Sequence, residues 1–312
     1  MPPQAEAGFD QRNVVIGSGD NFWTWSRDRG WDLTHPAPGE LGPLKTALAL
    51  RCELSNVTID TTKSALVIID LQNYSMCKAL APDVHPSLVM AQETLLNYGI
   101  PAARRANIQV IWLNWGLTDQ DLEKMPPAAF RTFGFKANSD ETDYGISVKT
   151  LDETIECGEA PRLTGLGADL GVIELENVTK VEAGRALMKG TWNAALHGPL
   201  LAMFEEGQTA PRPDVLIHKN RNSALWENHS DFEIFLKHEG IRTLLFTGAN
   251  TDQCVMATLQ DAHSKSFDTI LLKDGCATDS PQYAQQSAEY NCCRNWGFLS
   301  SCRALARGAA AI

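Results

Sequence analysis

From residue 63 onward, apolar runs of strand length alternate with helical segments, and this alternation constrains the fold more than any other feature. The expected strands cover residues 64–71, 108–115, 215–218, 241–248 and 268–275, and the expected helices cover residues 87–106, 231–240, 252–266 and 280–297. Continuous apolar runs such as "SALVIIDL" suit strands that are covered on both faces. Strands that alternate with helices indicate βαβ units with right-handed crossovers. We therefore expect a Rossmann-like α/β fold, a three-layer α/β/α sandwich around a central, mostly parallel sheet.

Two stretches lie outside this rhythm. Residues 1–60 are rich in Gly, Pro and Trp and show no sustained period, but Trp23, Trp25 and Trp31 argue against disorder, because disordered segments are poor in aromatic residues. We interpret them as an N-terminal extension that packs its aromatic side chains onto the core or a neighbouring subunit, ahead of a domain at 61–312. Within that domain, residues 117–212 form an insertion, either a lid or docking element or a plain surface excursion.

Composition excludes several classes of protein. The 312 residues carry a formal charge of −11, which argues against nucleic acid or an anionic membrane as the main partner. No apolar run approaches the ~18–20 residues that cross a bilayer, and the N-terminus lacks the pattern of a secretory signal. The eight cysteines include no CxxC pair of the kind that zinc sites use. We expect a reduced cytoplasmic protein without a metal or other cofactor.

Three residues that carry chemistry stand at predicted strand ends. Asp70 closes the first apolar run, Lys219 ends "VLIHK", and Cys254 follows the strand "RTLLFTG" and the turn "ANTD" at a helix start. Each has an ordinary alternative: a helix cap, a solvated cation and an inert buried thiol. Open α/β sheets bind ligands at the edge where these residues lie. A cysteine nucleophile needs a base and a cation, and the N–H groups of a helix start stabilise a thiolate or an oxyanion. Together the three residues favour a cysteine nucleophile.

The segments "VIIDLQN", "IHKNRNSALW" and "GANTDQCVMATLQDA", in this order and at strand ends, resemble the isochorismatase-like cysteine hydrolase superfamily. That superfamily includes nicotinamidases, N-carbamoylsarcosine amidohydrolases, ureidoacrylate and biuret hydrolases, and isochorismatases. The resemblance spans about residues 63–300 apart from the insertion, and the first 60 residues lie outside it.

The resemblance implies a role for each matched residue. Cys254 would be the nucleophile, Asp70 the general base, and Lys219 the cation that holds Asp70 and the thiolate in place. The backbone N–H groups of Asn250 and Cys254 would form the oxyanion hole, and a cis peptide is expected between Ala249 and Asn250. The implied reaction is hydrolysis of a small-molecule amide C–N bond through a Cys254 thioester.

Alternatives to this reaction stay open. "PAARRANIQVIWLNWGLTDQ" offers no histidine for the metal motif of nicotinamidases, so a metal-dependent nicotinamidase is not expected. Vinyl-ether hydrolysis of the isochorismatase type would depend on the aspartate more than on a nucleophile. A non-catalytic binding protein should have lost one of the three residues, and none is lost. A redox protein based on Cys292 and Cys293 is the weakest alternative, because adjacent cysteines rarely pair.

The expected partner is a small-molecule substrate, and the resemblance and the Trp-rich extension favour a homo-oligomer. Gln72 and Asn114 are candidates for orienting a polar substrate. Trp115 and Trp226 are candidates for the pocket walls, although both also suit core or subunit-interface positions.

Overall fold

A six-stranded parallel sheet forms the centre of the molecule. The computed structural model describes residues 14–36, 44–134, 148–149, 154–155 and 165–312, and the structural statements below concern these ranges. The strand order is β12-β7-β6-β13-β14-β15, and every neighbouring pair is parallel. The strands are β6 (Ser64–Ile69), β7 (Gln109–Trp115), β12 (Val215–Lys219), β13 (Thr243–Ala249), β14 (Asp268–Ala277) and β15 (Phe298–Ser300).

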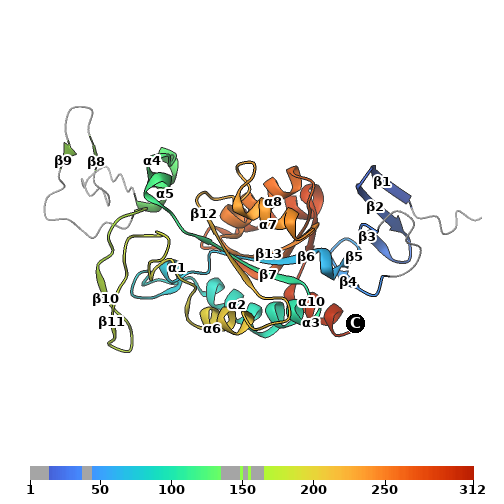
Figure 1. The fold of residues 1–312 in the computed structure, drawn as a ribbon, viewed down its shortest axis with the longest axis horizontal. Coiled ribbons are helices and arrows are strands. Elements are labelled where there is room, and N and C mark those ends of the chain that lie inside the picture. The colour runs from blue at the N-terminus through green and yellow to red at the C-terminus, as the bar shows by residue number, and fades with distance from the viewer. Residues whose placement is uncertain (1–13, 37–43, 135–147, 150–153, 156–164) are drawn as a thin grey trace, which may run out of the picture.

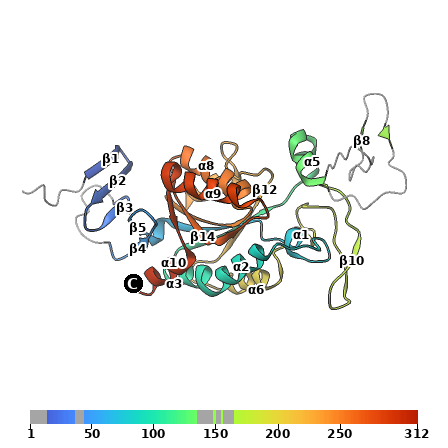
Figure 2. The same cartoon turned by 180° about the vertical axis from the view of Figure 1, so that it is seen from behind.

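Helices cover both faces of this sheet (Figures 1 and 2). One layer contains α2 (Pro86–Thr94), which continues through a π-helical segment into α3 (Ile100–Arg105), with α6 (Gly198–Gly207) and α10 (Cys302–Ala309). The other layer contains α7 (Asp231–His238), α8 (Met256–Ser264) and α9 (Gln282–Asn291). The expected three-layer sandwich is therefore confirmed.

The central strands are apolar throughout because both faces are covered. Every residue of β6, β7 and β13 is buried. Alternate residues feed opposite cores: Ile68 and Trp112 belong to one hydrophobic cluster, and Ile69 and Leu113 belong to the other. This double burial explains why continuous apolar runs, rather than alternating ones, mark the strands.

The first part of the chain forms a second sheet, which the aperiodic sequence of residues 1–60 did not predict. Its order is β1-β2-β3-β5-β4, with β3 and β5 parallel and the other pairs antiparallel. The strands are β1 (Val14–Ser18), β2 (Asn21–Ser26), β3 (Gly30–Leu33), β4 (Ala47–Arg51) and β5 (Asn56–Asp60). Figure 1 places this sheet at the end of the molecule opposite β10 and β11. Residues 1–13 and 37–43 lie outside the described ranges, and the domain boundary at residue 60 stays a prediction.

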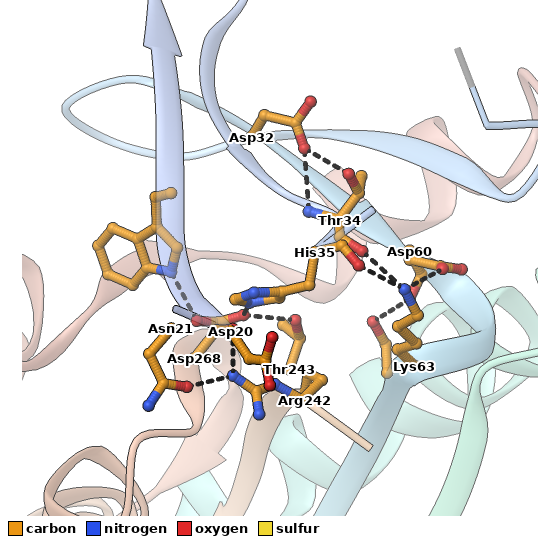
Figure 3. A network of polar contacts seen from close by, with 12 residues as sticks. Asp20, Asn21, Asp32, Thr34, His35, Asp60, Lys63, Arg242, Thr243 and Asp268 are labelled. Atoms are coloured by element: carbon orange, nitrogen blue, oxygen red, sulfur yellow. Dashed lines mark hydrogen bonds and ion pairs between the residues drawn. The ribbon is translucent and has the colours of Figure 1, made fainter. Parts of the chain in front are cut away.

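A polar network ties this N-terminal sheet to the main sheet (Figure 3). The buried carboxylate of Asp268, at the start of β14, accepts hydrogen bonds from Trp23 Nε1 at 2.6 Å and Thr243 Oγ1 at 3.0 Å. Nε2 of His35 lies 2.7 Å from the same carboxylate. The Trp23 ring also packs against Phe298 of β15, with the ring centroids 5.4 Å apart. One aromatic residue of the extension thus lies on the core.

The expected insertion at 117–212 is described only in part, because residues 135–147, 150–153 and 156–164 lie outside the described ranges. The described elements are α4 (Asp119–Glu123), α5 (Pro127–Gly134), the short strands β8 (Val148–Lys149) and β9 (Thr154–Ile155), β10 (Val172–Glu174), β11 (Lys180–Glu182) and α6. The last of these, α6, packs Phe204 against Trp112 of the central sheet, with the ring centroids 6.2 Å apart. The end of the stretch therefore belongs to the helical layer of the core.

A bilayer crossing is not found: within these ranges, no helix has both the length and the apolar character that one requires.

Candidate active site

The carboxyl ends of three strands bring Asp70, Lys219 and Cys254 together. Asp70 follows β6, Lys219 ends β12, and Cys254 lies in the π-helical turn Thr251–Val255 after β13. Because β7 lies between β6 and β12, the backbones of those two strands are roughly 10 Å apart. The long lysine side chain spans this gap, and its Nζ lies 2.9 Å from Oδ2 of Asp70.

Trp115, the last residue of β7, fills the space that Lys219 crosses. The Lys219 ammonium lies 3.9 Å from the centroid of the Trp115 ring, a cation–π geometry. It also donates a hydrogen bond to the carbonyl of Arg221 at 3.1 Å. The Lys219 side chain is fully buried, and that of Asp70 is 11% exposed. A buried charge of this kind is stable only when it is paired, so the two residues form one unit.

Hydrogen bonds fix the Asp70 carboxylate from a second direction. The residue has a left-handed backbone, with φ of 55°. Its Oδ1 accepts the backbone N–H of Trp115 at 3.2 Å, and the carboxylate is hydrogen-bonded to the Cys254 thiol. The result is a continuous chain from ammonium to carboxylate to thiol.

Burial dominates the ionisation of this site. It raises the pKa of Asp70, against the opposing effects of the Lys219 ammonium and of hydrogen bonds from Lys219, Cys254 and Trp115. Burial is also the main reason that the pKa of Cys254 is raised to about 12. The charge of Asp70 and the hydrogen bond to its carboxylate raise the thiol pKa as well, whereas the Lys219 ammonium and a hydrogen bond from the Trp115 side chain lower it. Cys254 is therefore a protonated thiol at neutral pH. The helix start does not produce the resting thiolate that the sequence suggested, because desolvation outweighs it.

The backbone around Cys254 has the conformation that the resemblance implied. The peptide bond between Ala249 and Asn250 is cis, as expected. Gly248 has φ of 110°, and a Cβ atom there would lie 2.1 Å from the carbonyl oxygen of Ile69. Only glycine allows β13 to approach β6 this closely. The oxyanion-hole role of the Asn250 and Cys254 N–H groups stays a prediction.

Cys254 and Asp70 open into a cavity of about 520 Å³. Its aromatic walls are Tyr74, Trp115 and Phe133, and the Trp115 and Phe133 rings meet edge to face with centroids 5.2 Å apart. Burial raises the pKa of Tyr74 to about 12, so its phenol stays neutral. Three apolar side chains of the expected insertion complete the wall: Leu170, Ile173 and Leu187.

Of the four residues expected to contact substrate, Gln72 and Trp115 line this cavity. The Gln72 amide is already bonded at both ends: Nε2 donates to the carbonyls of Trp115 (2.8 Å) and Ala194 (2.7 Å), and Oε1 accepts the Trp115 N–H at 3.0 Å. Its geometry suits holding the strand end more than contacting substrate.

The other two, Asn114 and Trp226, are not among the cavity's lining residues. Asn114 is 1% exposed and pairs in register with His218 of β12, and its side chain points to the opposite face from that of Trp115 because strand side chains alternate. Trp226 is 47% exposed and lines a neighbouring cavity of about 790 Å³. The Arg221 guanidinium lies over the Trp226 ring.

Several lining residues escaped the sequence interpretation. Tyr74 follows Asp70 by four positions, and Asp279 follows the carboxyl end of β14, which is the same edge of the sheet. The position of Asp279 just after a predicted strand could therefore have identified it as a candidate lining residue. Asp83 and Phe133 carry no such signal, because they lie in connections whose path depends on tertiary packing. Among the described residues, no three His, Cys, Asp or Glu side chains gather as a metal site.

Comparisons of sequence and of fold with known proteins point to the same group of proteins. The family model described as the isochorismatase domain matches residues 176–291. A ureidoacrylate amidohydrolase of Stutzerimonas stutzeri (strain A1501) is 27% identical over 259 residues, 82% of this chain and 86% of that protein. One from Azorhizobium caulinodans is 35% identical over 119 residues, 38% of this chain and 48% of its own length.

Two solved structures share the fold. A cysteine hydrolase from Pseudomonas syringae pv. phaseolicola 1448A has a TM-score of 0.53 and 14% identity, covering 84% of this chain and 97% of that one. An isochorismatase family protein from Desulfovibrio vulgaris has a TM-score of 0.51 and 17% identity, covering 80% and 98%.

Proposed function

We propose that this chain is a member of the isochorismatase-like hydrolase family and that it hydrolyses a small-molecule amide C–N bond through a thioester on Cys254. One observation carries the proposal: the Cys254 thiol is hydrogen-bonded to a carboxylate that is itself paired with a buried ammonium, at the wall of a cavity. The names of the relatives supply the class of bond, because an amidohydrolase cleaves a C–N bond.

Asp70 is the general base of the first step. As the Cys254 sulfur attacks the substrate carbonyl carbon, its proton passes to Asp70 and a C–S bond forms. The carbonyl oxygen becomes an oxyanion and accepts hydrogen bonds from the backbone N–H groups of Asn250 and Cys254. A thiol with a pKa near 12 needs such a base at neutral pH, and burial, which raises the pKa of Asp70, makes its carboxylate a stronger one.

The same proton completes the first half of the reaction, and a proton from water serves the second half. The tetrahedral intermediate collapses, the C–N bond breaks, and protonated Asp70 gives the proton to the leaving nitrogen. Water then attacks the thioester, Asp70 takes its proton, and collapse releases the acid and returns the proton to sulfur. Lys219 is the positioning cation, since its charge lowers the pKa of Asp70 and of Cys254.

One observation also fits vinyl-ether hydrolysis, the second candidate. Burial raises the pKa of Asp70, and a carboxyl group that keeps its proton can serve as a general acid toward a vinyl ether. That reaction needs no acyl-cysteine intermediate, which separates the two candidates experimentally.

Replacement of the cysteine tests the proposal. We expect Cys254→Ala and Cys254→Ser to lower kcat/KM on a hydrolysed amide at least about a thousandfold, measured as ammonia release. Cys276→Ala is the matched control, because Cys276 is a buried cysteine of the neighbouring strand β14, 7% exposed, outside the cavity's lining residues. Full turnover by Cys254→Ala would rule the thioester out.

A further inference from the structure

The charges around the Cys254 cavity have one sign. Its lining includes the carboxylates Asp70, Asp83 and Asp279 and no Arg or Lys among the described residues. The ammonium nearest to the site, Lys219, is buried behind Asp70 and offsets that carboxylate. Asp83 and Asp279 thus remain uncompensated.

These two carboxylates lie on adjacent loops at one rim. The loop before α2 carries Asp83, and the loop after β14 carries Asp279. Ser87, in the first turn of α2, donates a hydrogen bond from Oγ to the carbonyl of Thr278 at 3.0 Å, which joins the two loops. The two loops therefore lie side by side, and both aspartates belong to the lining of the same cavity.

Neither carboxylate has a cation as partner in the described parts of the chain. Asp279 accepts a hydrogen bond from the neutral amide of Asn250 at 2.8 Å, and Asp83 is exposed with no ion pair. His85, at the same rim, caps α2: its Nδ1 lies 3.3 Å from the backbone nitrogen of Ser87 and 2.8 Å from the Ser87 hydroxyl oxygen, and it forms no ion pair with Asp83 or Asp279. The rim is therefore negative.

Two described cations near this edge of the sheet line a different space. Lys124 and Arg221 line the neighbouring cavity, which shares Trp115, Thr132 and Phe133 with the first. The Arg221 guanidinium is held there by the carbonyls of Asn220 (2.6 Å) and Lys124 (2.9 Å). The aromatic wall thus separates a cavity that contains the thiol and, among its described charged side chains, only carboxylates from a cavity whose lining includes Lys124 and Arg221 together with Asp121 and Glu227.

Given the proposed function, on which this step rests, we propose that the substrate is an amide that carries an ammonium or similar cationic group, and no carboxylate, on the part that lies at the Asp83–Asp279 rim. A carboxylate there would meet two like charges and, among the described lining residues, no Arg or Lys to receive it, whereas a cation would meet two carboxylates and the aromatic rings of Tyr74 and Phe133. The chain would then differ in substrate charge from its ureidoacrylate-cleaving relatives, since an acrylate is an anion.

Charged thiol reagents test the cavity independently of turnover. The full chain is treated with methanethiosulfonates bearing a trimethylammonium, methyl or sulfonate group. In each case the Cys254 sulfur attacks the reagent's thio sulfur, a disulfide forms, methanesulfinate leaves, and the thiol proton passes to solvent. Rates are read by peptide mass spectrometry and normalised to 2-mercaptoethanol.

We expect the normalised rate at Cys254 to be about tenfold higher for the trimethylammonium reagent than for the sulfonate, and the ratio to shrink in high salt. Asp83→Asn should reduce this ratio several-fold. Asp28→Asn, which removes the same charge from the turn between β2 and β3, should not, because no residue of that turn lines the cavity. A ratio of one or less, or equal effects of the two variants, would overturn the proposal.

Three amides of similar length complete the test: 4-aminobutanamide, pentanamide and succinamate. The proposal predicts that kcat/KM for ammonia release falls in this order. Fastest turnover of succinamate would overturn the cationic substrate while leaving amide hydrolysis intact. Preference of Cys254 for the trimethylammonium reagent without turnover of any amide would support the negative cavity and count against the proposed function.

Discussion

Replacing Lys219 by Met removes the only charge that is paired with Asp70 in the described structure and keeps a side chain of similar length. At 2.9 Å and an effective dielectric constant near 20, the attraction between the two charges is about 6 kcal/mol before desolvation is subtracted. Leaving one member of a buried pair unpaired costs ~3–5 kcal/mol of unfolding free energy, and we expect a loss of this size in urea denaturation.

The same change should move the pH profile of activity. The reaction needs ionised Asp70, so kcat/KM rises as pH rises through the pKa of that group. Lys219 lowers this pKa, and without it the rise must occur at higher pH. We expect Lys219→Met to lower kcat/KM at pH 7 at least about tenfold, which is ~1.4 kcal/mol of activation free energy, with part of the activity recovered at alkaline pH.

A second buried ion pair supplies the control. Arg104 lies 2.8 Å from Asp214, with side chains 17% and 0% exposed, and neither residue lines the Cys254 cavity. Arg104→Met should also lose stability but keep the wild-type pH profile. Wild-type stability and pH profile in Lys219→Met, or an equal shift of the profile in Arg104→Met, would contradict this role of Lys219.

Three further changes have defined outcomes. Asp70→Asn removes the charge and the hydrogen bond that raise the pKa of Cys254, so iodoacetamide should alkylate Cys254 several-fold faster at pH 8 even though turnover is lost; slower alkylation would contradict this electrostatic picture. Gly248→Ala places a Cβ atom against the carbonyl of Ile69 at φ of 110° and should cost about 3 kcal/mol or more in urea denaturation, so wild-type stability would argue against the close approach. Asp268→Asn weakens the network of Figure 3 and should cost ~1–3 kcal/mol, with faster hydrogen exchange in β1–β3 and unchanged exchange in β6; uniform exchange would show that the network does not anchor the sheet.

The main sheet was predictable because its strands are buried on both faces. Such burial leaves a continuous apolar run in the sequence, and the expected strands at 64–71, 108–115 and 241–248 overlap β6, β7 and β13. The site was predictable for a related reason. Parallel strands end at one edge, so Asp70, Lys219 and Cys254 were expected together from their positions after strands, and the structure brings them together.

The N-terminal sheet was not predictable from periodicity. All five residues of β1 are exposed, so no apolar alternation marks that strand. The parallel pairing of β3 with β5 joins segments separated in sequence and depends on tertiary contacts. Local pattern carries little information about pairings of this kind.

The details of the site depended on burial, which the sequence does not display. A helix start suggested a thiolate at Cys254, whereas the surroundings desolvate the thiol and raise its pKa to about 12. Strand alternation did contain one usable signal, since neighbours such as Asn114 and Trp115 face opposite sides and cannot both line one cavity.

Trapping the thioester on Cys254 is the most direct test of the proposed reaction. Wild-type protein is quenched in acid during turnover of a hydrolysed amide and measured intact and after digestion. We expect a mass increase equal to the acyl group on the peptide that contains Cys254, removed by hydroxylamine and absent from Cys254→Ser. Unmodified Cys254 throughout rapid steady-state turnover and after single-turnover quenching, with product still formed, would contradict it and favour a reaction that uses Asp70 without a covalent intermediate.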